Sequence, residues 1–235
     1  MKRSNWSLGY LVNLFVSWAI ISGTTGYIPA AAYAGGVSQG EVQHRSDSLL
    51  PLTTPKRFGE DLFALGLQKC VEVWLLPDDH LIAACTESSR DTKKDYGIRL
   101  YILSKETGSY IIKQRFSGAR DAYSAHISFF SHAGKSVPEL IAVDYSAELS
   151  YGVLLYQYKA GVLKRIGAID LGFDDGNGGV ASVVPVMKIV STAQGFVVGF
   201  ESDVVKMLKN GTYVSIPKNR IRYVYDGHKL KEKRN

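Results

Sequence analysis

A pattern of short strands recurs three times along this chain, at a spacing of about 55 residues, and restricts the fold more than any other feature. Leu81–Ala83 recurs as Leu140–Ala142, and Gly195–Val198 occupies the same place once more. A second motif follows each copy, at Tyr96–Tyr101, Tyr151–Tyr156 and, more weakly, Arg220–Tyr225. Repetition of this kind indicates one supersecondary unit that is used several times.

The central copy shows the unit most clearly, because apolar and polar residues alternate with the period of two that half-buried strands require. Four strands in sequence, the last two joined by a tight turn at Ala160–Gly161, predict an antiparallel meander. Three meanders predict an all-β, propeller-like fold, open or partial because propellers usually close with about four or more blades. An irregular β-sandwich is the alternative. The strands of the central unit are expected at His126–Phe130, Leu140–Tyr145, Gly152–Tyr158 and Val162–Leu171. The first strands of the three units are expected to begin near Cys70, Ala125 and Val180.

The two cysteines, Cys70 and Cys85, are predicted to form a disulfide. Val71–Leu76 and Leu81–Cys85 have the composition of strands, and the Pro77–Asp79 turn between them predicts a hairpin that places the cysteines opposite each other. Facing residues in an antiparallel pair lie within reach of a disulfide. A redox-active pair is poorly supported, because the CxxC spacing is missing.

Residues 1–34 have the features of a secretory signal peptide. A basic start at Met1–Arg3 precedes the apolar run Leu8–Ile21, and Ala32–Ala34 has the small-x-small pattern of a cleavage site. A membrane anchor is the alternative, but the run is shorter than the roughly 20 residues that a spanning helix needs. We therefore expect export to the periplasm and no membrane span after cleavage.

The remaining boundaries follow from composition. Residues 35–53 are polar and aperiodic and are expected to be flexible, 54–228 to form a single β-repeat domain, and 229–235 a basic C-terminal tail. Thr54–Leu62 offers an N-cap candidate and a proline at the first helical position, so the sequence predicts at most one short helix, at this N-terminal position. Cleavage would leave 26 basic and 22 acidic residues, a net charge of +4 in place of +6. Such a mild excess argues against nucleic acid as a partner.

One unit also resembles a known family. The stretches 127–145 and 151–171 are similar to a blade of the FG-GAP/VCBS family of secreted β-propeller proteins. That resemblance implies the propeller-like architecture and a calcium loop before the second strand. Here Ser131–Lys135 stands where the family has acidic residues, and Lys135 would repel a cation. The loop is therefore expected to be free of metal.

Another loop is the best metal candidate. Asp174, Asp175 and Asn177 lie among glycines, and oxygen ligands on a flexible loop suit calcium. The EF-hand pattern and its closing glutamate are missing, and a plain turn between strands has the same composition. Calcium is the one cofactor that the sequence suggests. The histidines lack the spacing of a zinc site.

The sequence does not predict a catalyst. GxSxG, Walker and dinucleotide glycine patterns are all missing. Adjacent carboxylates on a strand point to opposite faces, so neither Asp pair is suited to acid–base chemistry. A glycosidase could still assemble carboxylates from distant strands, for example Asp144 with Glu148 or Asp170. A periplasmic hydrolase therefore stays as an alternative.

Two polar loops are the candidate binding elements. The first distantly resembles the Ser-Gly…Tyr loop that periplasmic lysozyme inhibitors insert into an active-site cleft, although its spacing is wider. The second bears tyrosines and an acid, and tyrosine is a frequent interface anchor. The candidate residues are Ser117, Gly118, Arg120, Asp121 and Tyr123 in the first loop, and Tyr145, Glu148 and Tyr151 in the second.

These observations favour a periplasmic protein-binding inhibitor or immunity protein, which would occlude a cell-wall-degrading toxin or lysozyme. The lack of catalytic motifs, the export signal and the loop resemblance support this hypothesis. A calcium- or carbohydrate-binding propeller-like module is the first alternative, and a hydrolase the second. The expected partner is another protein, with a second copy of the chain as the alternative.

Overall fold

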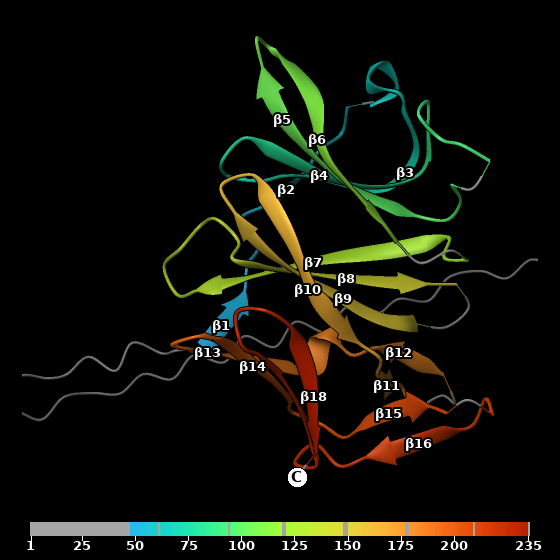
Figure 1. Cartoon of the computed structure of the whole chain (residues 1–235), viewed down its shortest axis with the longest axis vertical. Coiled ribbons are helices and arrows are strands. Elements are labelled where there is room, and N and C mark those ends of the chain that lie inside the picture. Colours follow the sequence, from blue (N-terminus) through green and yellow to red (C-terminus); the bar gives the residue numbers. More distant parts are fainter. Residues whose placement is uncertain are drawn as a thin grey trace, which may run out of the picture. The chain divides into compact units, whose positions relative to one another are not determined.

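The computed structural model describes residues 48–234 apart from 61, 94, 119–120, 148–149, 177–178 and 209. The predicted signal peptide lies outside the described residues. The described chain is all-β, as predicted, and its antiparallel strands form three sheets (Figure 1). No helix in this part of the chain is long and apolar enough to cross a membrane.

The first meander forms a five-stranded sheet in the order β2-β3-β4-β5-β6. Its four long strands form three consecutive pairs, β3 with β4, β4 with β5 and β5 with β6, as the repeat predicts, and the short β2 adds to the free edge of β3. Its strands are β2 (Lys56–Arg57), β3 (Leu67–Leu75), β4 (His80–Ser88), β5 (Arg99–Glu106) and β6 (Ser109–Ser117).

The other two meanders share one nine-stranded sheet in the order β10-β9-β8-β7-β1-β13-β14-β17-β18. β1 joins them, because Leu49 pairs with His132 of β7 and with Ile189 of β13. The strands are β1 (Ser48–Pro51), β7 (Ser124–His132), β8 (Leu140–Ser146), β9 (Ser150–Lys159), β10 (Val162–Ile169), β13 (Met187–Thr192), β14 (Gly195–Phe200), β17 (Ile221–Tyr225) and β18 (Leu230–Arg234).

The edges of the nine-stranded sheet approach each other, which makes it a nearly closed, barrel-like sheet. The Lys164 amine on β10 donates to the Tyr225 hydroxyl at 3.2 Å and to the Gly227 carbonyl at 3.1 Å. Gly167 permits the contact, because a Cβ atom there would lie 2.5 Å from Cβ of Leu230 on β18. The sheet therefore encloses an apolar interior.

The third meander differs from the prediction at its start and middle. Its first strand begins at Met187, because Val180 belongs to β12 in a separate four-stranded sheet, β12-β11-β15-β16. The β15–β16 hairpin of that sheet is inserted between the second and third strands of the meander (Figure 1). The remaining elements are β11 (Gly172–Asp174), β12 (Val180–Ser182), β15 (Val204–Met207), β16 (Tyr213–Ile216) and the 3-10 turns η1 (Phe63–Leu65) and η2 (Val184–Val186).

β8 shows how alternation builds two cores at once. Leu140 and Ala142 point into the interior of the nine-stranded sheet. Ile141, Val143 and Tyr145 point the other way, into a second core that the five-stranded sheet covers. A third core lies on the far face of the five-stranded sheet. Both faces of the central strands are therefore buried, as in a layered β structure.

The sequence allowed at most one short helix, at Thr54–Leu62, and the described residues of this segment form none. Lys56 and Arg57 pair with β3 instead, and the Phe58 amide donates to the Val73 carbonyl at 3.0 Å. Pairing at an open sheet edge satisfies these backbone groups, whereas a single helical turn leaves most of its own unsatisfied.

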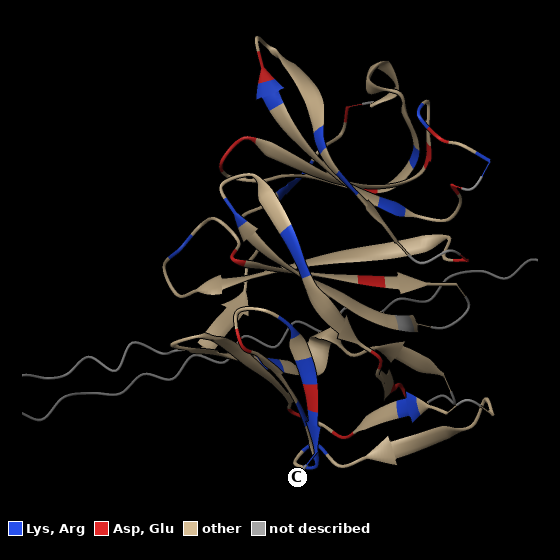
Figure 2. Cartoon of the chain, in the orientation of Figure 1, with Lys and Arg blue, Asp and Glu red and all other residues tan. Residues whose placement is uncertain are grey.

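The C-terminal segment also differs from its prediction. Leu230–Arg234, expected as part of a solvated tail, forms strand β18 and pairs with β17. Along this edge strand one acidic residue, Glu232, lies among the basic residues Lys231, Lys233 and Arg234 (Figure 2). The Lys206 amine reaches Glu232 at 2.9 Å and fixes the strand to β15. At the other end, Ser48–Pro51 belongs to β1 although it was expected to be flexible.

The predicted disulfide is present, since Cys70 and Cys85 are bonded and pair across β3 and β4. Replacing both cysteines with alanine will lower the free energy of unfolding by about 3 kcal/mol, because the bond restricts a loop of about 15 residues in the unfolded chain. Urea denaturation with and without reductant measures the effect. Identical unfolding midpoints for the oxidised and reduced wild-type protein would contradict it.

Candidate functional site

The two polar loops singled out in the sequence lie side by side. The Tyr123 amide of the first loop donates to the Ser146 carbonyl of the second at 3.2 Å. Gly118 lies against Tyr145, because a Cβ atom at Gly118 would sit 2.8 Å from that ring and 1.9 Å from the Ile98 carbonyl oxygen. Only glycine fits this contact, so the base of the first loop is held against the end of β8.

The individual candidates have different positions in this arrangement. Ser117 ends β6 and is exposed, as is Asp121, and 61% of Tyr123 is exposed to solvent. These three residues are available to a partner. Arg120, Glu148 and the Tyr151 side chain lie outside the described residues.

Tyr145 does not present an exposed ring to a partner. Its side chain is buried in the second core, and its hydroxyl has no hydrogen-bond partner within the described residues. Burial, followed by the neighbouring Tyr156, raises the pKa of the Tyr145 hydroxyl. Alternation along β8 explains the position, since Asp144 takes the opposite face. Tyr145 therefore supports the loops from beneath.

Two adjoining hollows extend the surface beside these loops. The larger, of about 280 Å³, is lined by Gly118, Tyr145 and Arg165. The smaller, of about 100 Å³, is lined by Ser150 and by residues of the β15–β16 hairpin. Both also contain Gly152 and Asp170, so they form one continuous surface.

The hairpin contributes the apolar groups of this surface. Met207 and Tyr213 pair across β15 and β16 and line the smaller hollow. Their exposed fractions are 56% and 41%, which is high for large apolar side chains. Neither residue was predicted from the sequence, although their place between two strands of the repeat could have pointed to them. The loop face is defined by Ser117, Gly118, Asp121, Tyr123, Ser150, Arg165, Asp170, Met207 and Tyr213.

The glycine-rich loop proposed for calcium has the hydrogen bonds of a turn. One Asp174 oxygen accepts from the Gly176 amide at 2.9 Å, and one Asp175 oxygen accepts from the Gly179 amide at 3.1 Å. No three His, Cys, Asp or Glu side chains gather into a metal site within the described residues. Asn177 lies outside them, and calcium binding at this loop stays a prediction.

The carboxylates named for a hydrolase have separate surroundings. Asp144 is buried and accepts a hydrogen bond from the Ser150 hydroxyl at 2.7 Å. Burial raises the pKa of the Asp144 carboxyl, although hydrogen bonds from Ser182 and Ser150 oppose the shift. Asp170 is exposed and lines the loop face, and no hydrogen bond joins it to Asp144 in the described chain. Glu148 lies outside the described residues.

Comparison with known proteins adds no relative. No protein-family model, curated protein or solved structure matches this chain. The candidate site therefore depends on the geometry of its own residues, and the resemblances to FG-GAP/VCBS repeats and to lysozyme inhibitors remain expectations from the sequence.

Proposed function

We propose that this chain is an exported protein-binding module, which inhibits a cell-wall-degrading toxin or lysozyme in the periplasm by covering its active-site cleft. The observation that carries the proposal is the loop face. Two polar loops that are 20 or more residues apart in sequence, at 117–123 and 144–151, meet through the Tyr123–Ser146 hydrogen bond and adjoin an exposed apolar hairpin.

The loop face has the mixed chemistry of a protein interface. Exposed Tyr123, Met207 and Tyr213 supply apolar and aromatic contact area, which dominates the binding energy of most interfaces. Arg165 and Asp170 add one charge of each sign beside them. A partner that fills the smaller hollow would contact Met207 and Tyr213, and one that also covers the first loop would bury Tyr123.

The scaffold beneath the loop face favours binding with little ordering of the chain. The loops start from β6 and β8, strands of two sheets that share the second core. Strands that are already packed against each other need no further ordering when a partner binds. The predicted signal peptide supports the compartment, since cell-wall hydrolases act outside the cytoplasmic membrane.

The test is a double substitution on the loop face. Purified wild-type protein is added to muramidases, amidases and periplasmic toxin extracts that degrade peptidoglycan, and the rate of turbidity loss is measured. We expect inhibition, and we expect Tyr123→Asp with Met207→Asp to raise the half-inhibitory concentration about tenfold or more, because both side chains would carry charge into an apolar contact.

Val162→Asp is the matched control, because Val162 is 55% exposed at the start of β10 and lies outside the loop face. It should inhibit as the wild type does. The proposal fails if the wild-type protein slows none of these enzymes, or if the double variant inhibits them equally well. Sedimentation as a dimer that the double variant abolishes would instead identify a second copy as the occupant of the loop face.

A further inference from the structure

A separate cavity of about 450 Å³ opens between the start of the domain and η2. Its walls are mostly apolar and include Trp74, Phe129, Phe130 and Met187. His126 is the one charged or titratable side chain among its lining residues in the described chain. Apolar cavities of this size with a few polar groups are typical of small-molecule sites. None of its lining residues belongs to the loop face.

A buried carboxylate fixes the orientation of His126. The Glu72 side chain is 5% exposed, and its Oε1 atom lies 3.1 Å from His126 Nδ1 and 3.0 Å from Arg57. Its Oε2 accepts from Trp74 Nε1 at 2.9 Å and from the Ile127 amide at 2.8 Å. Each carboxylate oxygen therefore has two partners, and Glu72 has no capacity left for a ligand.

The second nitrogen of His126 is left for the cavity. With Nδ1 held on Glu72, no hydrogen bond engages Nε2 in the described part of the chain, and 64% of the His126 side chain is exposed. The Glu72 carboxylate raises the pKa of His126, against the opposing effect of burial and of Arg57. Asp144 faces His126 from β8, and its charge acts with Glu72 to raise the pKa of His126.

The groups around His126 favour an anionic ligand over a cationic one. A cationic head would meet the His126 ring and find no free acceptor on Glu72, whereas an anionic head would find an available donor at Nε2. We propose that the cavity binds a small amphipathic carboxylic acid, with its apolar body against Trp74, Phe129 and Met187 and its carboxylate on His126 Nε2. The site is independent of the loop face and of inhibition.

Octanoate tests this proposal with 1-octanol as the uncharged control. The sequence has three methionines, Met1, Met187 and Met207, so ¹³C-methyl labelling gives one reporter in the cavity and one on the loop face. Octanoate is expected to shift the Met187 methyl signal saturably and to leave Met207 in place. His126→Gln should weaken octanoate binding about tenfold and leave octanol binding unchanged. The substitution removes the charged partner of the octanoate carboxylate and leaves the apolar walls of the cavity in place.

The wild-type protein provides a second readout that needs no substitution. Octanoate affinity should fall as the pH rises above 6.5 through the raised pKa of His126, while octanol affinity stays constant, because His126 loses its charge. The proposal is overturned if octanoate leaves Met187 unshifted, if Met207 shifts in parallel, or if neither His126→Gln nor the pH change alters the ratio of the two affinities.

Discussion

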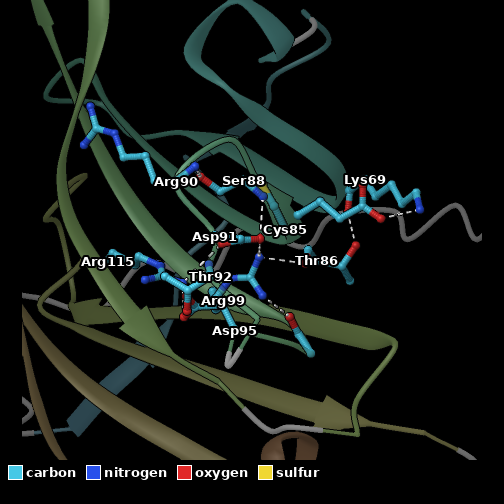
Figure 3. A network of polar contacts seen from close by, with 12 residues as sticks. Lys69, Cys85, Thr86, Ser88, Arg90, Asp91, Thr92, Asp95, Arg99 and Arg115 are labelled. Carbon is cyan, nitrogen blue, oxygen red and sulfur yellow. Dashed lines mark hydrogen bonds and ion pairs between the residues drawn. The ribbon is translucent and has the colours of Figure 1, made fainter.

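Replacing Arg99 with leucine will lower the free energy of unfolding by about 4 kcal/mol, the cost expected when one member of a buried ion pair is removed. Its guanidinium is 3% exposed and forms an ion pair with Asp91. It also donates to the Thr86 carbonyl at 2.7 Å, to the Gly97 carbonyl at 3.0 Å and to the Tyr101 hydroxyl at 3.1 Å. Figure 3 shows this network beside Cys85. The substitution would leave all four acceptors without this donor.

Arg115 provides the matched control for Arg99. It reaches Asp91 at 3.2 Å and also pairs with Asp95, but its side chain is 35% exposed. Arg115→Leu should therefore cost about 1 kcal/mol, as expected for a pair that water still reaches. Urea denaturation at neutral pH compares the two variants. If both variants lost the same free energy of unfolding, the burial of Arg99 would not explain its contribution to stability.

Replacing Glu72 with leucine will also cost about 4 kcal/mol. The carboxylate of β3 joins the five-stranded sheet to β7 of the nine-stranded sheet, through the Ile127 amide and His126. Leucine would leave the Ile127 amide and the Trp74 indole N–H without their acceptor, and buried donors without partners are costly. Thermal and urea unfolding measure the loss. A cost near zero would mean that the apolar contacts alone hold the two sheets together.

The contribution of the Glu72–His126 pair depends on pH in a defined window. Burial opposes ionisation of Glu72, but hydrogen bonds from His126, Trp74 and Ile127 outweigh it and lower its pKa below 4.5. Stability from Glu72 is therefore present above pH 4.5 and is lost as the pH falls through the lowered pKa. The pKa of His126 is raised above 6.5. The stability that His126 contributes is therefore present below pH 6.5 and is lost as the pH rises through the raised pKa. The difference in unfolding free energy between wild type and Glu72→Gln should be largest between these limits.

The repeat itself was predictable because its signal is local. Alternation along β8 places Ile141 and Val143 on one face and Leu140 and Ala142 on the other, and the same motif recurs in β4 and β14. The hairpin between Cys70 and Cys85 was predictable because its turn is short, but the turn itself pairs Leu75 with Leu81, and only a register shift between Cys70 and Glu72 sets the two cysteines opposite each other. Even the weak third copy at Arg220–Tyr225 corresponds to β17, in the expected place after β14.

The failures lie where backbone pairing partners are distant. Lys56–Arg57 had helical signals, but the open edge of β3 offered hydrogen bonds that a short helix could not match. β1 was placed in a flexible segment because four residues carry little periodicity, and its two neighbours are more than 70 residues away in sequence. The charged C-terminal residues read as a tail, although alternate positions of an edge strand tolerate charge well.

The candidate binding sites were also predictable from the sequence only in part. Composition identified the two loops, but sheet packing placed Tyr145 beneath them and added Met207 and Tyr213 beside them. Nothing local in the sequence connects His126 to Glu72, 54 positions earlier.

The sequence by itself determined that this chain builds antiparallel meanders with a cross-linked hairpin, because side-chain period and turn chemistry act over a few residues. Only the tertiary structure decided that two meanders share one sheet through β1, that the loops form one face, and that Glu72 holds His126 at a cavity. These features depend on which sheet faces and edges meet, and burial of apolar surface fixes that choice over the whole domain rather than within any one strand.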